Sequence, residues 1–132
     1  MAKYVYPAVF VQEKKGQFSV SFPDIDGCFT CGDDIAHAIE MAKDALALML
    51  YHMERAHQEP PALSDINTIK TKPKQFTSYV ACDTDVYRRK HNNRAVKKTL
   101  SIPEWLNEEA MEQGVNFSQV LQDGLKTALG LV

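Results

Sequence analysis

The sequence lacks the features of a membrane-bound or secreted protein. No apolar run approaches the ~18 residues that a membrane-spanning helix requires. The first residues, MAKYVYPAVFVQEKK, return to charge after few apolar positions and offer no small-residue cleavage site, so we expect no signal peptide. Cysteine is scarce, with 3 in 132 residues, and an odd number does not suit a disulfide scaffold. These absences predict a cytoplasmic protein with no membrane contact.

Net charge is also low, at −2, but the two signs are unevenly distributed. Through Asp85 the chain has 8 Lys and Arg against 12 Asp and Glu, whereas from Val86 onward it has 7 against 5. The stretch VYRRKHNNRAVKK contains no acid. Such a run is ordinarily a solvated face, but this one leads directly into a predicted strand. That position favours contact with nucleic acid, in which Arg94 takes part.

The first part of the chain predicts a β-β-β-α-β arrangement, with one helix on one face of a sheet. Phe18, Val20 and Phe22 alternate on one side of a strand, and EKKG supplies the preceding hairpin turn. The predicted strands are residues 4–11, 17–22, 28–31 and 76–82. Because one helix covers only one face, we expect the other face to be free for a partner.

The long helix of this part begins after Asp33 or Asp34, either of which can cap it, and ends before Pro60 and Pro61. Its apolar positions follow the spacing of a helix that covers a sheet. They are Ile35, Ala38, Ile39, Ala42, Leu46, Met49, Leu50 and Met53.

The C-terminal segment predicts a strand and two helices. In residues 97–102, Leu100 and Ile102 lie on one face and the polar side chains on the other. Pro103 ends the strand, Gly114 closes the first helix, and Asn116 caps the second with Gln119 as its capping-box partner. A module this small cannot bury its apolar surface alone, and a lone strand leaves its edge open. Both deficits disappear if two copies pair their strands and interleave their helices.

The segment LSIPEWLNEEAMEQGVNFSQVL resembles a ribbon-helix-helix domain, which reads the DNA major groove with paired strands. The resemblance implies base contacts from Lys97, Thr99 and Ser101. It implies a phosphate contact at the second helix N-terminus, residues 116–118, namely Asn116, Phe117 and Ser118. The implied dimer core is Leu100, Ile102, Trp105, Leu106, Val120, Leu121 and Leu125. The alternative is a two-helix dimerisation tail that does not touch DNA.

The stretch FPDIDGCFTCGDDIAHAIEMAKDALALML resembles the HicB antitoxin family, and NFSQVLQDGLKTAL is typical of that family's C-terminus. The resemblance implies a toxin-binding domain of reduced ribonuclease-H-like fold at 1–85, a basic linker or short helix at 86–95, and a ribbon-helix-helix domain at 96–132. It also implies a partner toxin of the HicA type, a ribonuclease that cleaves mRNA with a histidine. The antitoxin would block that toxin and repress its own operon as a homodimer, with a tetramer left open.

Catalysis by the chain itself is not expected. Ribonuclease H chemistry needs clustered carboxylates that hold two Mg²⁺ ions, and YVYPAVFV, the first strand, has none. Cys28 and Cys31 form a CxxC pair, but residues three apart on a strand face opposite sides of the sheet. We therefore expect no catalytic residue, no metal and no cofactor.

A weaker apolar stripe on the long helix, with an acidic turn before the third strand, suggests where a basic toxin would bind. The candidate contacts are Phe22, Pro23, Asp24, Asp26, Met41 and Leu48. A rival hypothesis is a ribbon-helix-helix repressor whose N-terminal domain senses a small ligand or metal. A third, an enzyme that uses Cys28 and Cys31, is weaker.

Overall fold

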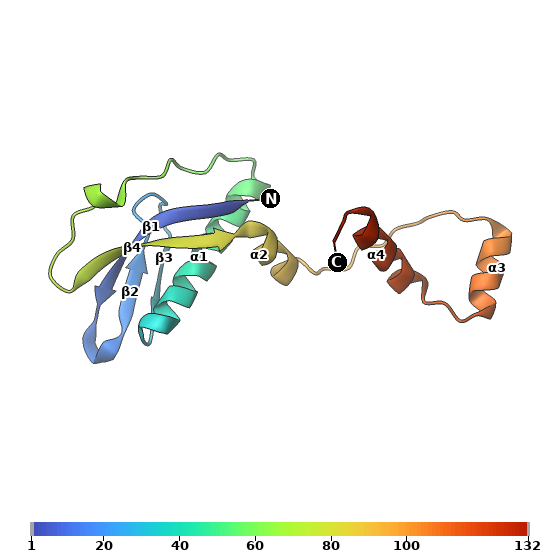
Figure 1. Ribbon diagram of the computed structural model, residues 1–132, viewed down its shortest axis with the longest axis horizontal. Coiled ribbons are helices and arrows are strands. Elements are labelled where there is room, and N and C mark those ends of the chain that lie inside the picture. The colour runs from blue at the N-terminus through green and yellow to red at the C-terminus, as the bar shows by residue number, and fades with distance from the viewer. Residues whose placement is uncertain (1, 132) are drawn as a thin grey trace. The chain divides into compact units, whose positions relative to one another are not determined.

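The computed structural model describes residues 2–131. The chain forms two compact units, the first ending at Arg94 and the second beginning at Ala95. A mixed α/β unit with a four-stranded sheet comes first, and an all-helical unit follows (Figure 1). None of the described helices is both long enough and apolar enough to cross a membrane.

The four strands expected from the sequence are present and form one antiparallel sheet in the order β3-β2-β1-β4. They are β1 (Lys3–Gln12), β2 (Phe18–Ser21), β3 (Phe29–Gly32) and β4 (Gln75–Asp83). A 3-10 turn, η1 (Lys14–Gly16), joins β1 to β2, with Gly16 at a φ of 78°. The alternation predicted for β2 is confirmed, because Val20 and Phe22 are buried and Phe18 packs against the same core. The two edge strands are therefore β3 and β4.

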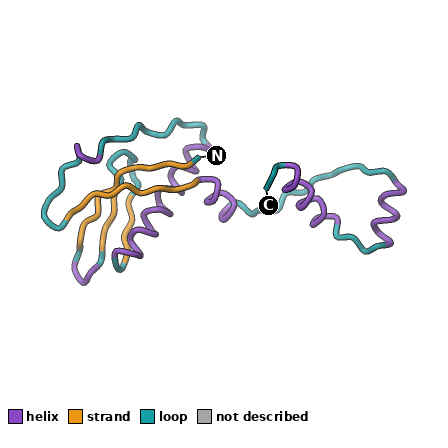
Figure 2. Tube along the Cα trace, viewed as in Figure 1, coloured by secondary structure: helices purple, strands orange, loops and turns teal. Residues whose placement is uncertain are grey.

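Helix α1 (Ile35–Arg55) packs across one face of the sheet (Figure 2). Asp34 caps it by accepting a hydrogen bond of 2.8 Å from the backbone N–H of His37. The residues that face the sheet recur every four positions and are fully buried, namely Ala38, Ala42, Leu46 and Leu50. The prediction of burial was wrong for Ile35 and Ile39, which are 39% and 50% exposed. Small Ala side chains let the helix approach the sheet closely, and the bulkier Ile side chains point outward.

The other face of the sheet is only partly open, which corrects the expectation of a fully uncovered face. The connection from α1 to β4 is held at three points. The Tyr6 hydroxyl donates to the Pro61 carbonyl, Ser64 donates to Asp24, and the backbone N–H of Ile66 donates to the Tyr79 hydroxyl. This connection includes the short turn η2 (Ile66–Thr68). Tyr6 belongs to the core on the α1 side, whereas Tyr79 pairs with Pro7 on the opposite face. The connection therefore covers that face near Tyr79 and leaves its β2–β3 side open.

Helix α2 (Thr84–His91) belongs to the first unit and contains part of the basic run. The Glu54 carboxylate of α1 accepts hydrogen bonds of 2.8 Å from both the Tyr4 and the Thr84 hydroxyls. Thr84 is 1% exposed, and Tyr87 packs its ring 5.4 Å from that of Tyr51. The basic helix is therefore fixed to α1, and the segment without helix or strand, residues 92–103, begins only after it.

The second unit holds α3 (Glu104–Glu112) and α4 (Phe117–Ala128). Gly114, at a φ of 68°, closes α3, and backbone bonds from Gly114 to Met111 and from Val115 to Ala110 complete the helix end. Asn116 caps α4 by accepting from the N–H of Gln119, as predicted. The reciprocal half of the capping box is not formed, because the Gln119 side chain donates to Asp123 instead.

Residues 97–102 form no strand in the single chain, which differs from the expectation. A strand exists only with hydrogen bonds to a neighbouring strand, and the described part of this chain offers none to this segment. The strand predicted from the alternation would therefore require a second chain.

Candidate functional site

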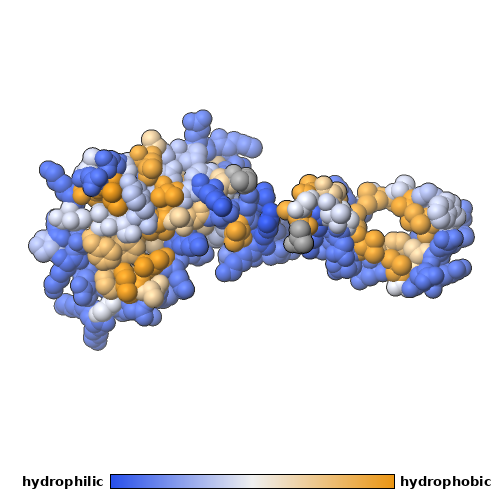
Figure 3. Space-filling model, in the orientation of Figure 1, coloured by the Kyte–Doolittle hydropathy of each residue, from blue (hydrophilic) through white to orange (hydrophobic). Residues whose placement is uncertain are grey.

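The described residues of the second unit, 95–131, form no hydrophobic core. Of these residues only Asn107, Ala110 and Val115 are even half-buried, and the rest are exposed. Trp105 is 61% exposed and Leu129 is 72% exposed. The seven residues expected in a dimer core, Leu100, Ile102, Trp105, Leu106, Val120, Leu121 and Leu125, are all among the exposed large hydrophobic side chains. Apolar surface lies along these helices in the space-filling view (Figure 3). Exposed apolar surface on this scale in a unit of 38 residues marks a surface for association.

The candidate DNA contacts lie in the same unit or directly before it. Lys97, Thr99 and Ser101 are exposed in the segment without secondary structure, and Arg94 precedes them. Phe117 and Ser118 are the first two residues of α4, where backbone N–H groups have no acceptor within the helix. The structure therefore leaves all the proposed contact residues accessible, and it positions the cap residue Asn116 by its bond to Gln119.

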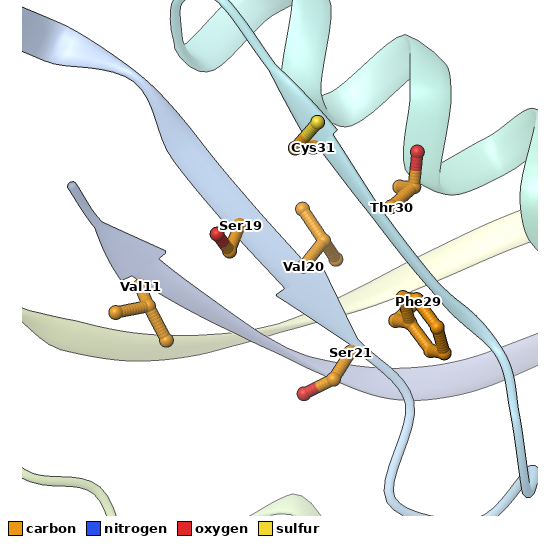
Figure 4. A pocket seen from close by; sticks show the side chains of 7 residues that line it. All are labelled: Val11, Ser19, Val20, Ser21, Phe29, Thr30 and Cys31. Atoms are coloured by element: carbon orange, nitrogen blue, oxygen red, sulfur yellow. The ribbon is translucent and has the colours of Figure 1, made fainter.

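A shallow hollow of about 420 Å³ lies on the open face of the sheet in the first unit. Figure 4 shows its lining side chains, which come from β1, β2 and β3. They are Val11, Ser19, Val20, Ser21, Phe29, Thr30 and Cys31. Phe29 is 74% exposed, the largest exposure of any aromatic side chain in the unit. Together with Val11 and Val20, the Phe29 ring gives this hollow an apolar lining.

The edge of the sheet beside this hollow is unpaired. The N–H of Phe22 donates to the carbonyl of Cys28, and the register pairs Val20 with Thr30. Because bonded and non-bonded positions alternate in an antiparallel pair, the N–H and C=O groups of Phe29 and Cys31 point away from β2. No hydrogen bond is formed by these outward groups within residues 2–131. The hollow and the free edge thus form one continuous surface.

The toxin contacts suggested by the sequence are not brought together. Phe22 is 3% exposed and lies in the core, so it has no surface to offer a partner. Asp24 is half-buried and accepts from both the N–H and the hydroxyl of Ser64, which gives it a role in holding the long connection. Pro23 and Asp26 are exposed in the same turn.

The other two suggested contacts lie on α1. Met41 is half-buried and lines a groove of about 830 Å³ between α1, α2 and the adjoining ends of β1 and β4. Leu48 is 38% exposed and is not among the residues that line it. The charged residues of this groove are of both signs, and they include Lys3, Lys43, Lys90, Glu40, Asp44 and Asp83.

Sequence reasoning missed Phe29. The four residues of β3 alternate, but alternation alone does not tell which face a helix covers. The structure decides the face at Gly32, where a Cβ would lie 2.3 Å from the Ala38 backbone nitrogen, so the Gly32 side of β3 must face α1. Phe29 and Cys31 then face the opposite way.

The cysteines do not form a chelating or redox pair. Cys28 and Cys82 are buried at 3% and 4% exposure, whereas Cys31 is exposed on the other face of the sheet. Burial raises the pKa of both buried thiols to about 11, so both are protonated at neutral pH. Among residues 2–131, no three His, Cys, Asp or Glu side chains are grouped so that they could hold a metal ion.

The difference in exposure predicts the reactivity of the thiols. In the folded chain at about pH 7.5, iodoacetamide is expected to alkylate Cys31 at least about tenfold faster than Cys28 or Cys82, because only an accessible thiolate reacts. Peptide mass spectrometry of timed samples measures the three rates separately, and a sample unfolded in urea serves as the control. Equal rates in the folded chain would contradict the described burial.

Comparison with known proteins identifies the family. The family model described as "HicB_like antitoxin of bacterial toxin-antitoxin system" matches residues 6–121, most of the chain. The chain belongs to the HicB-like antitoxin family. Its combination of a four-stranded antiparallel sheet with four α-helices is similar to that of HicB antitoxins.

Individual relatives agree with this assignment. One solved structure, a toxin-antitoxin complex from Streptococcus pneumoniae, is similar with a TM-score of 0.63 and 28% identity, covering 96% of this chain and 99% of that chain. A HicA3 and HicB3 toxin-antitoxin complex is similar over 61% of this chain and 99% of that chain, with 26% identity and a TM-score of 0.50. An uncharacterized 14.9 kDa protein of Haemophilus phage HP1 is 26% identical over 99 residues, which is 75% of this chain and 73% of that protein.

Proposed function

We propose that this HicB-like protein neutralises a HicA-type, mRNA-cleaving ribonuclease by binding it, and represses its own operon by binding DNA. The first unit binds the toxin and the second binds the operator as a homodimer. The protein acts by occlusion and has no catalytic role of its own. Family membership and the toxin-antitoxin complexes among its structural relatives support the toxin partner.

The observation that supports the DNA-binding part of the proposal is the exposed apolar surface of the second unit. Its large apolar side chains are exposed, and the segment before α3 alternates Leu100 and Ile102 with polar residues. Pairing two such segments antiparallel makes a two-stranded ribbon and covers the apolar side of both copies. The opposite side of the ribbon then presents Lys97, Thr99 and Ser101 to base edges in the major groove.

A gel-shift assay on the operator tests the ribbon. Replacing Lys97 and Thr99 by Ala is expected to relax base preference and to weaken binding by about 1–3 kcal/mol for each good hydrogen bond to a base that is removed. Lys126→Ala is the matched control, because it removes the same charge near the end of α4. Normal operator binding by the doubly substituted chain would show that the ribbon assignment is wrong.

Growth rescue tests the toxin-binding part. Cells that express the HicA-type toxin are expected to resume growth when this chain is co-expressed, and residues 1–94 alone are expected to be sufficient. The reason is that the first unit has its own buried core, which includes Phe10, Ile25, Leu46 and Leu50. Rescue by the full chain but not by a folded 1–94 fragment would place inhibition in the second unit or in oligomerisation.

A further inference from the structure

We propose that the toxin docks on the hollow of the open sheet face and adds an extended segment to the free edge of β3, with Phe29 as the apolar anchor. This inference rests on the proposed antitoxin function and names the surface that performs it. The surface is defined by the hollow-lining residues Val11, Ser19, Ser21, Phe29 and Cys31, and we call it the β3 surface.

The chemistry of the β3 surface suits a protein partner. Val11 and Phe29 provide apolar area, and Ser19 and Ser21 provide hydroxyls between them. The outward N–H and C=O groups of Phe29 and Cys31 can each bond to an incoming strand, as in recognition by strand addition. A short edge strand carries few such bonds, so the exposed ring must supply much of the affinity.

Charge complementarity selects the toxin as the occupant. Residues 13–34, which form β2, β3 and the turns around them, contain four Asp and one Glu against Lys14 and Lys15, a net charge of −3. Of these carboxylates, that of Glu13 lies beside the hollow, where its Oε1 accepts a hydrogen bond of 3.1 Å from the Ser19 hydroxyl. A ribonuclease must present a basic surface to hold RNA, and an acidic border attracts such a surface and speeds its association. A second copy of this chain docked through the same surface would bring two acidic borders together, and their repulsion disfavours it as the occupant.

The groove beside α1 is the competing surface, and its charges do not select a basic partner. Lys3, Lys43 and Lys90 line it together with acidic residues, so the attraction for a cationic protein largely cancels. Val86, which is 60% exposed, supplies its most open apolar side chain. A glutamate introduced into one surface at a time therefore shows which of the two surfaces binds the toxin.

The test uses the full chain and a HicA-type toxin whose catalytic histidine is replaced by Ala. Phe29→Glu is expected to raise the dissociation constant about 30-fold or more, the effect of losing a central anchor. Val86→Glu, the matched control, is expected to change it less than about threefold. Both positions are exposed, and circular dichroism together with urea unfolding verifies that the first unit of each variant is folded. An unchanged affinity for Phe29→Glu, or a large loss for Val86→Glu alone, would overturn the proposal.

Strand addition has its own test at Cys31. Cys31→Pro removes one outward N–H and leaves the bonds between β2 and β3 in place, because proline is tolerated where an edge N–H faces solvent. It is expected to weaken toxin binding about tenfold relative to Cys31→Ala, about the effect of one hydrogen bond and its buried acceptor. Equal binding by the two variants, both verified as folded, would show that the edge is not used.

The unaltered protein supplies an independent test. Cys31 is the one cysteine on the β3 surface, and the other two thiols are buried. Saturating toxin is expected to slow iodoacetamide alkylation of Cys31 at least about tenfold, measured on the peptide that contains it. An unprotected Cys31 in a complex shown to have formed would refute docking here. Failure of the unaltered chain to bind the toxin at all would instead refute the proposed function.

Discussion

Changing Leu121 to Glu is expected to abolish operator binding, lowering the affinity at least about 100-fold. Leu121 lies in the middle of the apolar stripe of α4, one helical turn from Phe117 and from Leu125. Burying an unpaired carboxylate in a dimer interface costs several kcal/mol. In the proposed dimer one ribbon requires two chains, so disrupting the dimer would remove both the strand pairing and the contact with DNA. Gel shift on the operator and sedimentation velocity measure the two effects.

The control for this change lies next to it. Gln122→Glu introduces the same charge one position along α4, on its polar side, and is expected to leave dimerisation and DNA binding within about threefold of the unaltered chain. The fragment 95–132 should also melt at a temperature that rises with concentration, as expected for a unit that folds only with its partner. A folded fragment whose transition is independent of concentration would contradict the dimer.

Replacing Gly32 by Ala is expected to lower the free energy of unfolding of the first unit by about 3 kcal/mol, and Gly32→Val by more. A Cβ at this position would lie 2.3 Å from the nitrogen and 2.5 Å from the Cα of Ala38. These are backbone atoms of α1, so no side chain can rotate away, and the helix must move off the sheet. Urea unfolding followed by circular dichroism measures the change.

Gly27→Ala provides the comparison, because nothing lies within 4 Å of the Cβ it would add. Gly27 has a φ of 75°, in the left-handed region. Alanine at this position is therefore expected to lower the free energy of unfolding only by the cost of that backbone conformation, about 1 kcal/mol. A Gly32→Ala chain as stable as Gly27→Ala would mean that α1 is not seated against β3 as described.

The sequence predicted the elements of the first unit well, because local rules decide them. The alternation of Phe18, Val20 and Phe22 defined a half-buried strand, and the carboxylate before Ile35 marked the start of the helix. The burial of Ile39 was predicted wrongly, because periodicity locates an apolar stripe but not which edge of it touches the sheet. That choice depends on how closely Ala38 and Ala42 let the helix approach.

The sites were harder to predict than the fold, for two different reasons. The exposure of Phe29 follows from which face α1 covers and from where the long connection runs, and both are long-range results of folding. The strand that alternation predicts at residues 97–102 is not formed in the single chain, and in the proposed dimer it would pair with a second chain. Phe22 was suggested as an apolar anchor beside the acidic turn, but its ring is buried in the core.

In the first unit, the beginning of β1 and the beginning of α2 are hydrogen-bonded to each other and to α1. The backbone N–H of Thr84 donates to the carbonyl of Ala2 at 2.9 Å, and Glu54 holds both Tyr4 and Thr84 by their hydroxyls. The start of β1 and the start of α2 therefore lie side by side, although the first unit itself ends only at Arg94. The same proximity means that a bulky fusion joined directly to the N-terminus would press on the first turn of α2, so an affinity tag there needs a flexible spacer.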